Sequence, residues 1–202
     1  DFECLMLWPS DHRLDRCAAL VCLGSGSRPT RCEAVAMPLT NDGAPGAAQA
    51  PIDLNPLYGP LRAQQGALNI EGAFLLGDTF VLLNRGLPGE APNAAFGFDA
   101  KAVGALLFEG ARQDVLPTRM HSFNLGAIDG VPLACTDGKA LPSSHACHGG
   151  WLFSATAEDR SNSYDDGGCR GSAIGVVDKA GCLSALWRID ANVKVEGIDW
   201  RQ

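Results

Sequence analysis

Four acidic residues recur in apolar, strand-like stretches of the sequence, and together they could hold a metal ion. They are Glu3, Glu71, Asp137 and Glu196. Carboxylates that face one cavity repel one another unless a cation or a proton compensates their charge, and calcium accepts several oxygen ligands in a flexible geometry. The series therefore predicts a Ca²⁺ site, with Mg²⁺ as second choice. The alternative is that each acid accepts hydrogen bonds from backbone amides of the neighbouring repeat.

A second group of polar residues lies where each predicted second strand ends. It comprises Ser25, Ser27 and Arg28, then Asn84 and Arg85, and then Glu158 and Asp159. Arg28 and Arg85 could bind a carboxylate or phosphate through paired hydrogen bonds, whereas charge balance favours their pairing with the acids of the first series. In a catalytic site, Glu158 or Asp159 would act as general base while Arg85 holds an anionic substrate group.

Residues 159–168 read Asp-Arg-Ser-Asn-Ser-Tyr-Asp-Asp-Gly-Gly, and their alternating oxygen side chains resemble the start of an EF-hand calcium loop. However, Tyr164 stands where the sharp turn of that loop requires glycine, and Arg170 stands where a glutamate should close it. These departures favour a polar surface loop. If the loop folds over a central channel, Asp165 or Asp166 could still contact a bound ligand.

Cys135, His145, Cys147 and His148 are residue types that bind zinc, but their spacing matches no standard zinc finger or ribbon. His121 is isolated in the sequence, which indicates a surface position. The short motifs of common hydrolases and of nucleotide-binding loops are absent from the sequence.

The chain repeats a pattern of short strands. The expected strands are 2–8, 18–24 and 33–39, then 68–76, 79–84, 94–99 and 105–108, and then 131–141, 151–158, 172–178 and 183–189. A short helical turn is expected within 53–65, where Pro56 suits a first helical position. Residues 194–200 begin a further round, because Lys-Val-Glu-Gly there matches Asn-Ile-Glu-Gly at 69–72. The glycine after each glutamate allows close approach of the backbone.

A fixed period with about four strands per unit is typical of a β-propeller. The sequence predicts an all-β propeller with four-stranded blades at 1–66, 67–130 and 131–193 and the start of another at 194–202. A β-sandwich is the main alternative. Because about three blades cannot close a ring of five to seven, we expect a longer protein or a second copy of the chain to supply the rest.

The composition limits the partners. The formal charge of −7 and the pI of about 5.0 argue against nucleic acid and anionic membranes, whose phosphates require clustered Lys and Arg. No apolar run approaches the length of a membrane span, so a soluble protein is expected, in the cytoplasm or the periplasm. Most cysteines are expected to be free thiols, and those with apolar neighbours are expected in the core: Cys4, Cys22, Cys135 and Cys182.

Several motifs together resemble an uncharacterised bacterial β-propeller family over nearly the whole chain. They are residues 24–28, 68–72, 84–86, 155–159, 164–167, 171–175 and 194–197. The Lys-Val-Glu-Gly element also resembles the channel strand of esterase-like phytase and gluconolactonase-type propellers. Members of those groups hold a divalent cation in the channel, and the resemblance would place it at Glu71 and Glu196. The first family implies a fold and no particular activity.

Two functions are compatible with these patterns. The first is a non-catalytic propeller that binds a small molecule or a protein through its loop face, with Arg28, Arg85, Asp165 and Asp166 as ligand-binding residues and a Ca²⁺ in the acidic channel. The second is a metal-dependent hydrolase of phosphoester or lactone substrates, in which the cation lowers the pKa of a bound water. Propellers host both classes, and the sequence favours binding.

Overall fold

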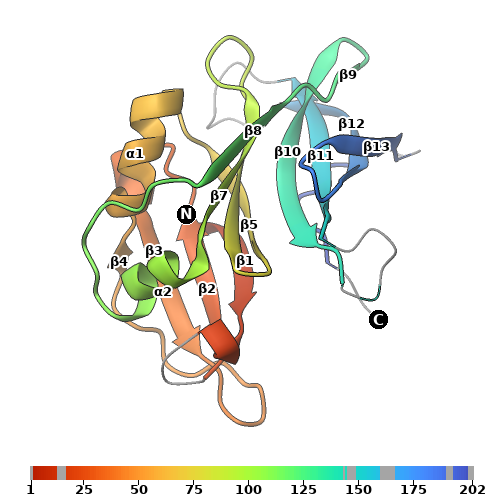
Figure 1. The fold of residues 1–202 in the computed structure, drawn as a ribbon. Helices are drawn as coiled ribbons and strands as arrows, with labels where there is room; N and C mark the ends of the chain where they lie inside the picture. The colour runs from red at the N-terminus through yellow and green to blue at the C-terminus, as the bar shows by residue number, and fades with distance from the viewer. Residues whose placement is uncertain are drawn as a thin grey trace.

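The computed structural model describes residues 2–12, 17–142, 144, 149–159, 167–189 and 193–199. Three antiparallel sheets form the framework of this part of the chain (Figure 1). The first sheet contains β1 (Phe2–Trp8), β2 (Ala19–Gly24), β3 (Glu33–Pro38) and β4 (Ile52–Asp53). The second contains β5 (Ile70–Leu76), β6 (Thr79–Asn84), β7 (Asn93–Asp99) and β8 (Arg119–Phe123). The third contains β9 (Ala127–Ile128), β10 (Val131–Ala140), β11 (Trp151–Asp159), β12 (Gly168–Val177) and β13 (Leu183–Arg188).

Each sheet is a meander in which strands that follow one another in the chain are hydrogen-bonded neighbours. The sheets lie side by side (Figure 1), and β5 contacts β1 on one side and β10 on the other. The sequence predicted an all-β chain; the structure is mostly β, with antiparallel sheets and two α-helices besides.

The second sheet is packed on both faces because its strands alternate between two cores. In β6, Phe80 and Leu82 face the first sheet, whereas Val81 and Leu83 face the third. We call the interface between the first and second sheets the first seam, and that between the second and third sheets the second seam. Strands that are buried on both faces read as continuous apolar runs, as Phe-Val-Leu-Leu does in β6.

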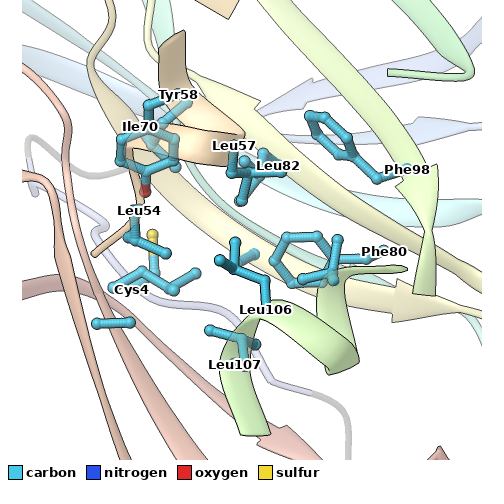
Figure 2. Packing of buried hydrophobic residues seen from close by; sticks show 14 of the residues in the cluster. Cys4, Leu54, Leu57, Tyr58, Ile70, Phe80, Leu82, Phe98, Leu106 and Leu107 are labelled. Carbon is cyan, nitrogen blue, oxygen red and sulfur yellow. The ribbon is translucent and has the colours of Figure 1, made fainter. Parts of the chain in front are cut away.

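Two helices complete the first seam. Helix α1 (Asn55–Gln65) buries Leu57, Tyr58 and Leu61, and α2 (Ala100–Phe108) buries Leu106 and Leu107. Figure 2 shows Leu57, Tyr58, Leu106 and Leu107 packed together with Cys4 of β1 and with residues of the second sheet. The turn expected within 53–65 is therefore a full helix. Two 3₁₀ turns, η1 (Ser10–His12) and η2 (Pro29–Arg31), lie beside the first sheet.

The strand predicted at 105–108 is wrong, because these residues belong to α2. The side chain of Asp99 accepts a hydrogen bond of 2.9 Å from the Ala102 backbone N–H, which caps the first turn, and the following Ala and Leu residues are strong helix formers. The fourth strand of the second sheet is β8 instead. Its residues are mostly exposed, so no buried-strand pattern marks it in the sequence.

Two further expectations need correction. Residues 193–199 belong to no strand, although 194–200 was predicted to be one; Trp200 lies outside the described residues. Cys182 is exposed rather than buried. Within the described part of the chain, the cysteines are free thiols as predicted, and no helix is long and apolar enough to cross a membrane.

Candidate functional site

Strands β1, β5 and β10 each carry a β-bulge in their pairing with the strand that follows. The register shifts between Phe2 and Cys4 in β1, between Ile70 and Gly72 in β5, and between Cys135 and Asp137 in β10. The extra residues are therefore Glu3, Glu71 and Thr136. A bulge re-aims a side chain and interrupts pairing. Alignment of the sequence placed Asp137 beside the two glutamates, but in the fold Thr136 takes the equivalent position and Asp137 follows it.

Three of the predicted acids surround one buried thiol. Burial raises the pKa of the Cys4 thiol well above its usual value, and the carboxylates of Glu71, Asp137 and Glu3 raise it further. The close approach of β5 and β10 brings two of these acids near each other. A Cβ atom on Gly72 would lie only 3.1 Å from the Asp137 Cα, so the glycine after Glu71 is required by that approach, as its position predicted.

Arg85 is the centre of a buried ionic network. Its guanidinium is 3.5 Å from the Glu71 carboxylate and 2.5 Å from that of Glu158. The side chains of Arg85 and Glu158 are only 3% and 1% exposed. Lys194 lies 3.2 Å from Glu158 and 2.8 Å from Glu196. The network therefore joins the end of β6 to β5, to β11 and to the segment 193–199.

This network supports the alternative in which Arg85 pairs with acids of the first series. Burying an arginine with two carboxylates requires charge compensation, which Lys194 completes around Glu158. The Glu71 carboxylate also accepts a hydrogen bond of 2.8 Å from the Asn69 amide. Among the residues that the structure describes, the buried Nε of Arg85 has no hydrogen-bond partner.

The remaining acids of the predicted series have partners of their own. Glu3 lies 3.5 Å from the Arg31 guanidinium at the exposed edge of the first sheet. Asp137 accepts hydrogen bonds of 3.0 Å from the Ile198 N–H and 2.7 Å from the Gly138 N–H. Burial raises the pKa of Asp137, and these two N–H donors oppose that shift.

These contacts test whether the predicted acids fit a shared calcium ion. Each is engaged by a lysine, an arginine or a backbone N–H rather than directed at a common point. Among the residues that the structure describes, no three His, Cys, Asp or Glu side chains are grouped closely enough to hold a metal. The arrangement of these acids therefore does not fit the oxygen coordination of a calcium ion. The calcium site stays a prediction, which calcium titration can test.

Residues 193–199 are held against the third sheet by a row of buried hydroxyl groups. Thr136 and Thr156 donate hydrogen bonds to the Val195 carbonyl at 2.7 and 3.1 Å. Ser172 donates to the Val193 carbonyl at 2.7 Å and accepts from the Val195 N–H at 3.1 Å. This attachment places Lys194 and Glu196 in the ionic network.

The other predicted ligand-binding residues lie elsewhere. Arg28 is exposed at the start of η2, beside the first sheet. Asp159 is exposed and pairs with Arg170 at 3.1 Å. Asp165 and Asp166 lie outside the described residues, as do most of the EF-hand-like loop and His145, Cys147 and His148 of the zinc hypothesis.

A cleft of about 420 Å³ opens beside the network on the second seam. Its walls come from the loop after Arg85, from the end of β8 and from the start of β10, and they include Leu87, Phe123 and Pro132. Glu90, which is exposed, is the only charged residue among those that line the cleft. Asn93 supports the wall by accepting hydrogen bonds from the N–H groups of Gly86 and Cys135, each at 2.9 Å.

Sequence reasoning missed Lys194, Thr136 and Asn93. Lys194 could have been found, because residues two apart lie on one side of an extended segment, and Lys194 and Glu196 are two apart. Thr136 and Asn93 gave no comparable signal, since the contacts of Thr136 with Val195 and of Asn93 with Leu133 and Cys135 join residues far apart in the sequence.

Comparison with known proteins gives one assignment. A family described as a family of unknown function, DUF6910, matches residues 1–202. The chain belongs to this family. No curated protein and no solved structure matches the chain. The DUF6910 match supports the resemblance to an uncharacterised family and leaves the site to be interpreted from its geometry.

Proposed function

We propose that this chain is a propeller-type binding domain that takes a small organic cation with an aromatic or apolar group in the cleft on the second seam. The propeller assignment rests on two four-stranded meanders and one five-stranded meander, in which β5 lies between β1 and β10. Binding, rather than hydrolysis, is supported by the burial of Arg85 and Glu158 against each other, which leaves neither group directed at a substrate.

The size and lining of the cleft are the main support for this proposal. Its volume of about 420 Å³ falls in the range usual for small-ligand sites, and such sites combine apolar walls with a few polar groups. Leu87, Phe123 and Pro132 provide apolar surface, and Glu90 offers a negative charge. The net charge of −7 would also attract a cation towards the protein.

The buried network gives the cleft a fixed wall. Arg85 immediately precedes the Gly86–Asn93 lining, and its backbone N–H donates to the Asn69 carbonyl at 2.8 Å. Its side chain is held by Glu71 and Glu158. Because pre-organisation lowers the cost of binding, we infer that the network acts as a positioning element for the cleft rather than as a ligand contact.

The test is an NMR titration of the folded chain with benzylammonium, which supplies a ring and a positive charge. Saturable shifts are expected at the amides of Gly86, Gly89 and Gly126, and benzoate should not reproduce them. Ala91→Trp should fill the cleft and abolish the shifts, whereas Ala48→Trp, on an exposed loop, should leave them unchanged. Shifts that survive Ala91→Trp, or equal shifts with benzoate, would contradict the proposal.

Calcium titration of the same sample separates the hydrolase alternative. The hydrolase requires one-to-one calcium binding that is lost in both Glu71→Gln and Glu196→Gln, whereas a binding domain is compatible with the ion present or absent, so a lack of calcium binding would contradict the hydrolase. Benzylammonium binding with no response to calcium would favour the binding domain.

A further inference from the structure

A second, more enclosed cavity lies at another part of the second seam. It has a volume of about 70 Å³. Its apolar lining residues come from both sheets: Leu76, Val81, Ala95, Trp151 and Val177. The Trp151 ring is held in place by aromatic neighbours, with ring centroids 5.5 Å from Phe74 and 5.8 Å from Phe123. The cavity therefore has a rigid apolar floor.

Basic side chains gather around this floor. Arg119 and His121 are alternate residues of the edge strand β8, so they lie on one face of the second sheet. Their register partners are Gly97 and Ala95, and Ala95 belongs to the core of the second seam. Lys179, from the turn between β12 and β13, lines the cavity from the third sheet.

The turn that carries Lys179 is fixed. The Asp178 carboxylate accepts hydrogen bonds from the N–H groups of Ala180 and Cys182 at 2.8 and 3.0 Å. A Cβ atom on Gly181 would lie 2.6 Å from the His121 Cε1, so the imidazole rests directly on the Gly181 backbone. His121 is exposed, as predicted, and it also contacts the third sheet through Gly181.

The charges at this site are not neutralised by ion pairs. Within the described part of the chain, neither Arg119 nor Lys179 lies in a salt bridge, and the carboxylate of Asp178, the one acidic lining residue, is engaged by its own turn. A local excess of positive charge in a protein of net charge −7 creates a site that attracts anions.

We propose that this cavity binds a small organic anion, a carboxylate with a compact apolar group. The apolar group occupies the floor against Trp151, and the carboxylate lies at the mouth between Arg119 and Lys179, with His121 at its side. The site differs from the proposed cation cleft in its charge and in nearly all of its lining residues, so the two can fail independently.

The probe is isobutyrate, and isobutyramide is a neutral control of the same shape. We expect isobutyrate to shift the Trp151 indole N–H and the amides of Gly149 and Gly181 with an affinity of roughly millimolar, as befits a ligand with so few heavy atoms. Isobutyramide should leave these signals unchanged. The indole signal can be assigned from the Trp151→Phe variant.

A matched pair of variants tests the charges. Arg119→Gln combined with Lys179→Gln should weaken isobutyrate binding about tenfold, because each exposed charge contributes modestly. Lys101→Gln combined with Arg112→Gln removes the same charge from exposed positions elsewhere and should leave the affinity unchanged. Equal responses to isobutyrate and isobutyramide, unchanged affinity in the first double variant, or shifts away from this cavity would overturn the proposal.

Discussion

The two seams of this molecule are built in different ways. The first seam has an apolar core that is completed by α1 and α2. The second has no helix in its core, contains the Arg85–Glu158 ion pair at one end and borders both candidate binding cavities. Buried ion pairs contribute little net stability compared with apolar packing. The difference indicates that the first seam serves mainly to stabilise the fold, and under the binding proposal the second seam also positions polar groups beside the cleft.

The largest expected effect comes from the buried arginine of the second seam. Arg85→Met leaves Glu71 and Glu158 without their shared cation, and we expect a loss of about 3–5 kcal/mol in the free energy of unfolding. The control is Arg62→Met, because Arg62 of the first seam donates to neutral groups, the Gly26 carbonyl and the Cys32 thiol. It should cost about 1–2 kcal/mol. Urea unfolding measures both, and equal losses would contradict the difference between the seams.

A pair of leucines tests the packing of the first seam. Leu82 of β6 is fully buried in the first seam, whereas Leu5 lies on the face of β1 away from that seam and is 67% exposed. We expect Leu82→Ala to lower the free energy of unfolding by about 2–5 kcal/mol, and Leu5→Ala to change it by less than about 0.5 kcal/mol. A large loss in Leu5→Ala would show that the outer face of the first sheet is covered in solution.

The smallest predicted effect is a pH dependence due to Asp137. A carboxyl group whose pKa is raised by folding destabilises the native state when it is ionised, and this penalty disappears as the pH falls through the folded pKa towards the unfolded value. Burial raises the pKa of Asp137. The stability of the wild type relative to Asp137→Asn should therefore increase between pH 7 and pH 4. A difference that stays constant or decreases over this range would refute the raised pKa.

Most of the fold could be predicted from the sequence because its strands bury alternating or continuous apolar residues. Strands β6 and β10 follow such patterns closely. Strand β8 could not be predicted in this way, since Arg-Met-His-Ser-Phe lies at the exposed edge of its sheet. The segment 105–108 was misassigned because a short apolar run fits both a buried strand and a helix. The residue that caps the helix, Asp99, lies several residues before this segment.

The candidate site was predictable only in part. Charge balance correctly favoured the pairing of Arg85 with an acid, and Glu71 is one of its partners. The stronger contact with Glu158 depends on packing across the second seam, which joins residues far apart in the chain. The one-residue offset of Asp137 arises from the bulge at Thr136, which changes register without leaving a mark in the sequence. Both cavities combine residues from different sheets, so only the folded chain brings them together.

The most direct test of the central claim is a crystal structure of the chain grown with saturating benzylammonium. The binding proposal predicts that the ring occupies the cleft between Leu87, Phe123 and Pro132 with its ammonium group near Glu90. An empty cleft under conditions where binding is measured in solution, or a ligand bound against the first seam, would contradict the claim that the second seam is the binding region.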